Sequence, residues 1–250
     1  MYYCCGITEK GIMPHNEDAL LLDGNVLSEG KAEKRLQPPF IAAVSDGVSG
    51  ESAGEVASRM CLEMVSEVAV FSQDGLKESL MEIHRRLADY SRDDPDSRNM
   101  QTTLCGLAVN EDGGVVVFNV GDSRLYRFRE GRISQLSRDQ SLVQLLYEEG
   151  SITKEERKTH VHRNIIFPAF GNVTTEPTID VEEIDGMEYG DVLILCSDGL
   201  SDNLSAFDIQ EIMELPKGLP KRLDMLVKAA LLRGSTDNIT VAAIVYEYEK

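Results

Sequence analysis

The sequence predicts an α+β fold, a four-layer α-β-β-α sandwich in which two antiparallel sheets pack together and helices flank them. Three observations favour this class. Short apolar runs follow one another through tight Asp-Gly and Glu-Gly turns, which is typical of antiparallel strands. Blocks of strands and blocks of helices succeed each other without the alternation of a doubly wound fold. Amphipathic segments carry apolar stripes that must be buried against a sheet.

The first half of the chain predicts strands and then two helices. Residues 1–11, 19–30 and 40–47 are apolar runs that end in turns, and they are predicted to be strands. Residues 30–39 are polar and are predicted to be a loop. Residues 53–71 and 74–93 repeat apolar side chains every three or four positions, which predicts amphipathic helices.

The second half predicts strands first and helices later. Strands are expected at residues 102–110 and 114–121, and a hairpin at 123–137. A helical segment at 141–160 is interrupted by Gly150, and strands follow at 175–184 and 191–199. Helices at 206–216 and 218–234 and a strand at 238–249 complete the chain. Since we find no Pro/Gly/Ser-rich linker, we expect a single domain over residues 1–250.

The composition limits the classes of partner. The 25 basic and 43 acidic residues give a net charge of −18, which argues against binding a nucleic acid. Cation binding and a solvated acidic surface both fit this charge. We expect no membrane partner, because no apolar run is long enough to span a bilayer and the N-terminus does not resemble a signal peptide. We therefore expect a cytoplasmic protein and a monomer. The five cysteines form no Cys-x-x-Cys pair, which argues against zinc.

Carboxylates recur at the ends of apolar segments. The motif Ser-Asp-Gly follows such a segment twice, at 45–47 and 197–199. Asp202 closely follows the second copy, and further acidic residues end or precede apolar segments at 16–18, 122 and 237. A single Asp-Gly pair after a strand is usually only a turn. Five such places together favour a site for Mg²⁺ or Mn²⁺, because hard oxygen ligands offset the cost of burying carboxylates. Two ions that share a carboxylate activate water for phosphoryl transfer.

The ordered set of motifs resembles the metal-dependent serine/threonine protein phosphatases of type 2C. The segments that carry the resemblance are NEDALLL (16–22), FIAAVSDGVSGESAGEVAS (40–58), TTLCGLAV (102–109), VFNVGDSRLYRFREGRISQLSRDQS (117–141), HVHRNIIFPAFG (160–171), GDVLILCSDGLSDNLS (190–205) and GSTDNITVAAIV (234–245). The resemblance implies hydrolysis of phosphoserine and phosphothreonine in proteins by a water activated between two metal ions. It also implies the four-layer sandwich and a flap at about residues 140–163.

The resemblance implies two Mn²⁺ or Mg²⁺ ions per chain and their ligands. Asp46 would bridge the ions, the Gly47 carbonyl would bind one of them, and the binuclear pair would be completed by Asp198 and Asp237. The three aspartates Asp46, Asp198 and Asp237 would thus act in catalysis through the activated water. Glu17 and Asp18 would supply a further ligand and a supporting carboxylate. A third, weaker ion would be bound by Asp122, Asp198 and Asp202.

Three positions depart from the family pattern. Met13 stands where members usually carry an arginine that grips phosphate, so His15 or another cation must substitute or phosphate binding is weaker. Val48 stands where animal-type members have a histidine proposed as general acid, which indicates a bacterial-type enzyme. Phe167-Pro168 replaces a common Thr-Arg pair. His160 and His162 are candidate proton donors, although we interpret them as surface histidines.

Two alternatives stay open at this level. The first is a pseudophosphatase that binds phosphorylated partners without turnover, which the missing arginine favours and the retained aspartates disfavour. The second is an unrelated di-metal hydrolase of small phosphate esters, which the length of the match disfavours. The partner that we expect is a phosphoprotein substrate, with a Ser/Thr kinase system as a further candidate.

Overall fold

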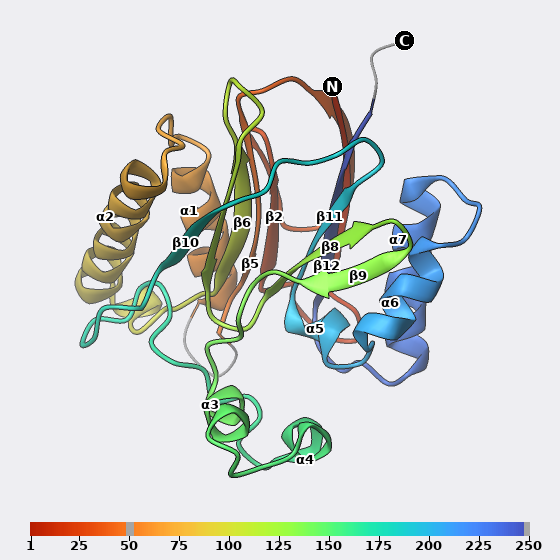
Figure 1. The fold of residues 1–250 in the computed structure, drawn as a ribbon. Helices are drawn as coiled ribbons and strands as arrows, with labels where there is room; N and C mark the ends of the chain where they lie inside the picture. Colours follow the sequence, from red (N-terminus) through yellow and green to blue (C-terminus); the bar gives the residue numbers. More distant parts are fainter. Residues whose placement is uncertain (49–52, 248–250) are drawn as a thin grey trace.

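Two six-stranded sheets face each other in a computed structural model that describes residues 1–48 and 53–247 (Figure 1). Every pairing between their strands is antiparallel. The first sheet has the order β4 (Gly30–Leu36), β1 (Tyr2–Glu9), β12 (Ile239–Tyr246), β11 (Val192–Cys196), β8 (Arg124–Arg129) and β9 (Arg132–Gln135). The second has the order β10 (Asp180–Ile184), β7 (Val115–Val120), β6 (Leu104–Val109), β5 (Phe40–Asp46), β2 (Asp18–Leu22) and β3 (Asn25–Leu27).

Helices cover the outer face of each sheet, which makes four layers and confirms the predicted fold class (Figure 1). Helices α1 (Gly54–Val65) and α2 (Gln73–Asp93) pack on the second sheet. Helices α6 (Ala206–Met213) and α7 (Leu219–Leu232) pack on the first. The amphipathic stripes of these helices are buried because each sheet offers them an apolar outer face.

Strand β2 shows why the central strands are continuously apolar. Leu20 and Leu22 point into the core between the two sheets, whereas Ala19 and Leu21 point into the core under α1 and α2. Successive side chains of a strand alternate between its faces, so a strand in a middle layer must be apolar on both. Burial of each such leucine contributes roughly 1.5–3 kcal/mol to the hydrophobic stabilisation.

The prediction of a loop at 30–39 is wrong, because residues 30–36 form the edge strand β4. Its main chain pairs with β1 from Gly30 opposite Thr8 to Leu36 opposite Tyr2. Its side chains are alternately exposed, and the exposed ones are Lys31, Glu33 and Arg35. An edge strand that faces solvent needs no apolar alternation, and its charges keep other strands from pairing with it.

The first predicted helix is shorter than expected, since α1 ends at Val65 and not at residue 71. Ser66 closes its last turn by donating a hydrogen bond from Oγ to the Glu63 carbonyl. Val68 and Phe71 still pack against the core under α1 and α2, which explains their apolar spacing. The β-branched Val68 and Val70 disfavour a continued helix.

Residues 140–163 contain α3 (Leu142–Glu148) and α4 (Lys154–Thr159), which extend away from the sandwich at one end (Figure 1). Helix α4 begins with a capping box, in which Thr153 and Glu156 satisfy each other's backbone N–H groups. The break between the two helices falls at Gly150, as predicted, where φ is 73°. In the described part of the chain, no helix combines the length and the apolar character needed to cross a membrane.

Candidate active site

The two Ser-Asp-Gly motifs follow strands of different sheets. Asp46 is the last residue of β5 in the second sheet. Ser197 follows β11 in the first sheet, and Asp198 begins the short helix α5 (Asp198–Ser201). Two carboxylates from different sheets are thereby placed at one end of the sandwich.

The glycine of each motif permits a close backbone approach. A Cβ at Gly47 would lie 2.4 Å from the carbonyl oxygen of Gly54, at the start of α1. A Cβ at Gly199 would lie 1.9 Å from the carbonyl oxygen of Asn238. Both distances are far below van der Waals contact, so each position requires glycine for the tight packing behind its aspartate.

The serines of the two motifs are structural, and Ser197 also holds a carboxylate. Ser45 Oγ donates to the Thr103 carbonyl at 2.7 Å and shares a 2.7 Å bond with Thr102 Oγ1. Ser197 Oγ donates to Asp18 Oδ2 at 2.8 Å and accepts from the Thr240 backbone N–H at 3.0 Å. The contact of Ser197 with Asp18 was not predicted from the sequence.

Asn238 is a second residue that sequence reasoning missed. Its Oδ1 accepts from the Glu17 backbone N–H at 2.8 Å, and its Nδ2 donates to the carbonyls of Lys10 and His15. The loop that carries Glu17 is thus fastened to the turn before β12. An asparagine directly after Asp237 was the available signal, because Asn side chains commonly bond to nearby backbone groups.

Glu17 and Asp18 occupy neighbouring positions around Asp46. Asp18 is opposite Asp46 in the β2–β5 pair and is 1% exposed. The Glu17 side chain lies over the start of α1, since a Cβ at Gly54 would be 3.1 Å from Glu17 Cδ. Three carboxylates therefore approach the first Ser-Asp-Gly turn.

Burial and mutual repulsion raise the pKa values of this acidic group. Burial raises the pKa of Asp18 to about 6, although hydrogen bonds from Thr240 and Ser197 oppose the shift. Burial, followed by the charges of Asp18 and Asp198, raises the pKa of Asp46 well above its usual value. These carboxylates are costly to ionise together unless a cation joins them.

The three carboxylates predicted to bind the third ion, Asp122, Asp198 and Asp202, also have raised pKa values. Burial raises the pKa of Asp122 to about 7, with further contributions from Asp139 and Asp202. Burial, Asp122 and Asp202 raise the pKa of Asp198 well above its usual value. Burial also raises the pKa of Asp202, whose side chain is more exposed than the others.

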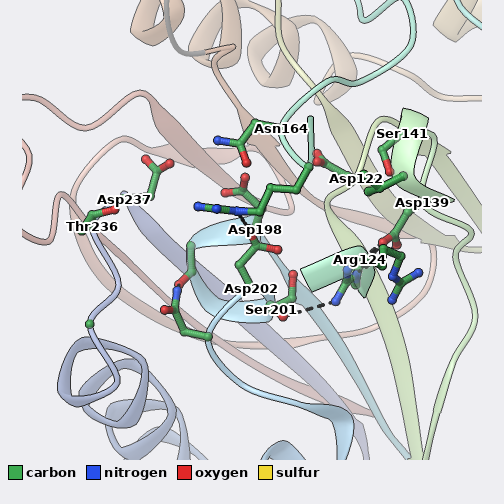
Figure 2. Close-up of a pocket in the computed structure, with 16 residues that line it drawn as sticks. Asp122, Arg124, Asp139, Ser141, Asn164, Asp198, Ser201, Asp202, Thr236 and Asp237 are labelled. Atoms are coloured by element: carbon green, nitrogen blue, oxygen red, sulfur yellow. Dashed lines mark hydrogen bonds and ion pairs between the residues drawn. The ribbon is translucent and has the colours of Figure 1, made fainter. Parts of the chain in front are cut away.

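These side chains border an open pocket of about 230 Å³. Figure 2 shows Asp122, Asp198 and Asp202 close together in it and Asp237 on the other side of Asp198. Asp46 does not line this pocket, but it is opposite Asp18, whose carboxylate is bonded to Ser197 next to Asp198. The fold therefore brings four of the predicted aspartates to one pocket and places Asp46 and Asp18 beside it.

The donors suit Mg²⁺ or Mn²⁺ in their chemistry. They are carboxylate oxygens, which these hard cations prefer. Asp18 Oδ1 is buried and has no hydrogen-bond partner within the described residues, so it can still accept a cation or a donor. Among the described residues, no three His, Cys, Asp or Glu side chains are close enough together to coordinate one metal ion. The match of this site to Mg²⁺ or Mn²⁺ therefore rests on the carboxylate chemistry of the donors and on their burial.

Three arginines line the pocket, and they differ in how firmly they are held. Arg124 forms a bidentate pair with Asp139 at 2.6–3.1 Å and also donates to the Ser201 carbonyl. Arg157 donates to Gln144 and lies 5.6 Å above the Tyr147 ring. Arg163 is 52% exposed and approaches Asp202 only to 3.8 Å. Arg163 is therefore the pocket arginine most easily redirected to an incoming anion.

The positions that depart from the family pattern, and the histidines considered with them, do not line this pocket. Met13 is half-buried in a turn closed by its N–H to the Lys10 carbonyl at 3.0 Å. His15 and His162 are exposed and His160 is half-buried, with the rings of His160 and His162 5.6 Å apart. Phe167 is 37% exposed, and its N–H donates to the Gln140 carbonyl.

Comparisons with known proteins agree with this architecture. The model of the Protein phosphatase 2C family matches residues 30–215. A serine/threonine phosphatase stp from Listeria monocytogenes is 33% identical over 248 residues, which cover 95% of this chain and 93% of that protein. The serine/threonine protein phosphatase PstP from Mycobacterium tuberculosis is 34% identical over 84% of this chain and 41% of its own length.

Solved structures superpose on almost the whole chain. The serine/threonine phosphatase Stp1 from Staphylococcus aureus has a TM-score of 0.83 at 28% identity, over 99% of this chain and 96% of that chain. The catalytic domain of the serine/threonine protein phosphatase PstP, in complex with two manganese ions, has a TM-score of 0.79 at 26% identity, over 99% of this chain and all of that chain.

A sandwich of two antiparallel sheets with an acidic pocket at one end defines a protein phosphatase of the metal-dependent class. Within that class, the chain belongs to the protein phosphatase 2C family. The resemblance drawn from the ordered motifs is thereby confirmed.

Proposed function

We propose that the acidic pocket is the catalytic centre of a metal-dependent phosphatase that hydrolyses phosphoserine and phosphothreonine in proteins. The observation that carries the proposal is that Asp122, Asp198, Asp202 and Asp237 line one pocket, with Asp46 and Asp18 paired beside it. The pKa values of Asp46, Asp122 and Asp198 are raised, and carboxylates with raised pKa values in a pocket are typical of a functional site. Membership of the family supports the reaction class and the use of Mn²⁺ or Mg²⁺.

Two ions would be held by Asp46, the Gly47 carbonyl, Asp198 and Asp237, with Glu17 and Asp18 beside them. A third would be held by Asp122, Asp198 and Asp202. When bound, the ions supply an activated water as nucleophile and positive charge for the phosphoryl oxygens.

The chain's own residues orient these carboxylates and receive the substrate. Ser197 fixes one oxygen of Asp18, and Asn238 fixes the loop of Glu17. Arg163 would bind the substrate phosphate, because a guanidinium matches two phosphate oxygens and this one is only loosely held. Arg163 would thus replace the phosphate-binding arginine that is absent at Met13.

The test is phosphate release from a phosphothreonine peptide by the purified protein, titrated with MnCl2. Turnover should depend on Mn²⁺ and disappear in Asp198→Ala. Calorimetric Mn²⁺ binding without turnover in the native protein would instead support the pseudophosphatase, which the missing arginine at Met13 favours.

Four further features remain our proposals. They are a single domain over residues 1–250, a flap at about 140–163, a monomeric state and a cytoplasmic location. A Ser/Thr kinase that phosphorylates the same substrates is the partner system that this activity would oppose.

A further inference from the structure

A second cavity, of about 450 Å³, opens beside β10 and shares no lining residue with the acidic pocket. Its floor is apolar and consists of Val117, Leu125 and Leu136, which belong to the core between the sheets. Strand β10 is at the end of its sheet, so the floor is open to solvent along that edge. A cavity of this size is in the range of small-molecule sites.

The rim carries one cation and one anion that lack partners. Lys77 on α2 and Glu182 on β10 both line the cavity and are exposed. Across residues 1–48 and 53–247, neither has a hydrogen bond or an ion pair. Glu182 is opposite Val117 in the β10–β7 pair, which places it on the same face as the apolar floor.

The other rim charges are already engaged. Arg138 is paired with Glu148, and Asp180 accepts from Gln140 Nε2 at 2.9 Å. Glu182 is on the face of the floor, and Lys77 comes from α2 on the other side of β10, so the two free charges flank the cavity and complement a small zwitterion with an apolar side chain. A ligand with only one charge would leave Lys77 or Glu182 unpaired.

The cavity wall is connected to the acidic pocket through Gly121. Asn119 lines the cavity and is 3% exposed, and its Nδ2 donates to the carbonyls of Gly121 and Arg138. Its Oδ1 is buried and has no hydrogen-bond partner within the described ranges, so this wall has an unsatisfied acceptor. Gly121 directly precedes Asp122 of the acidic pocket.

Gln140 extends the same network. Its Oε1 accepts from the Gly121 N–H at 3.0 Å, and its Nε2 donates to the rim residue Asp180. Its own N–H donates to the Gly121 carbonyl, and its carbonyl accepts from Phe167. One glutamine thus joins the cavity rim, the Asp122 turn and the segment after α4.

We propose that this cavity binds a free α-amino acid with a large apolar side chain, and that the bound amino acid stiffens the Asn119–Gln140–Gly121 network next to Asp122. Its carboxylate pairs with Lys77, its ammonium group pairs with Glu182, and its side chain lies on Val117, Leu125 and Leu136.

Calorimetric titration of the full chain with L-phenylalanine tests the binding. One saturable site is expected, with weaker binding of 3-phenylpropanoate and of phenethylamine, which each lack one charge. Lys77→Gln and Glu182→Gln should each weaken the binding of L-phenylalanine by up to about fivefold, because an exposed ion pair contributes at most about 1 kcal/mol. The matched control is Lys228→Gln, at an exposed position of α7, which should leave binding unchanged.

Amide hydrogen exchange with and without L-phenylalanine tests the connection. The N–H groups of Gly121 and Phe167, which both donate to Gln140, should exchange more slowly in the complex. Lack of saturable binding, or binding that both rim variants leave unchanged, would overturn the site. Binding without slower exchange would overturn the connection. Neither measurement uses phosphatase turnover, so failure here is distinct from failure of the proposed function.

Discussion

Ser197 Oγ donates a 2.8 Å hydrogen bond to Asp18 Oδ2, which joins residues 179 positions apart in the chain and in different sheets. The other oxygen of Asp18 is buried and lacks a hydrogen-bond partner within the described residues. The hydroxyl thus fixes the carboxylate in one orientation and leaves its second oxygen available next to Asp46.

Ser197→Ala should therefore weaken Mn²⁺ binding as well as stability. The substitution removes the bond to Asp18 and leaves the Thr240 N–H without its acceptor, at a cost of about 1–3 kcal/mol. Ser45→Ala is the matched control, because this serine has the same place in its motif but bonds to Thr102 and Thr103. Calorimetry with Mn²⁺ and chemical denaturation measure the two effects. Equal losses of Mn²⁺ affinity in both variants would contradict a specific role for Ser197.

Asp198→Asn should separate stability from activity. Burial and the neighbouring Asp122 disfavour the ionised form of Asp198, so a neutral side chain should stabilise the metal-free protein. We expect a gain of about 1 kcal/mol, or a rise in Tm of about 2–4 °C, together with loss of Mn²⁺-dependent turnover.

The control for that experiment is Asp89→Asn on the exposed face of α2. Surface substitutions of this kind change the free energy of unfolding by no more than about 0.5 kcal/mol. A lower Tm for metal-free Asp198→Asn would show that the carboxylate is already stabilised without ions.

Arg163→Gln should raise KM for a phosphopeptide by about tenfold or more, because a charge-assisted hydrogen bond contributes about 1.5–3 kcal/mol. Arg163→Lys keeps the charge but loses the bidentate geometry, so we expect an intermediate KM. Steady-state kinetics at saturating Mn²⁺ measure both. Arg157→Gln is the comparison, because Gln144 and Tyr147 already hold that side chain. A larger rise in KM for Arg157→Gln would transfer the role to Arg157.

Met13→Arg should lower KM for the same peptide. The variant restores a cation at the position where family members usually carry one, in a loop fastened to the turn before β12 by Asn238. The side chain of Met13 is half-buried, so the substitution should leave folding intact. An unchanged or raised KM would mean that this loop no longer presents the residue to substrate.

His84 should make the free energy of unfolding decrease as the pH falls. Its Nδ1 accepts from the Gly171 N–H, and burial lowers its pKa, while Glu176 opposes and Arg85 supports the shift. A lowered pKa favours the neutral form in the folded state. Its contribution to stability is therefore fully present above the unfolded pKa of about 6.5 and is lost as the pH falls through the folded value.

His84→Asn keeps an acceptor for Gly171 but does not titrate. Denaturation at pH 5.0 and 7.5 should show that the native protein loses more stability at acid pH than the variant does. The same loss in both proteins would assign the pH dependence to other groups.

The sequence alone determined the sandwich and most of its elements. Central strands such as β2 are apolar on both faces, and the stripes of α2 and α7 match the helical period, so local pattern and final environment agree. Residues 30–36 escaped prediction because an edge strand is held by main-chain bonds to β1, which leave no apolar signature. The end of α1 escaped it because Val68 and Phe71 pack on the same core without being helical.

For the site, the sequence indicated the aspartates, because five places with carboxylates at the ends of apolar segments together favour a cation site, although one such place would not. It did not determine that Ser197 holds Asp18, that Asn238 holds the Glu17 loop, or that Arg163 is the least restrained cation in the pocket. Those relationships join residues from different sheets and loops. Only the packing of one sheet on the other decides which hydroxyl meets which carboxylate, since hydrogen-bond geometry depends on distances that no local pattern encodes.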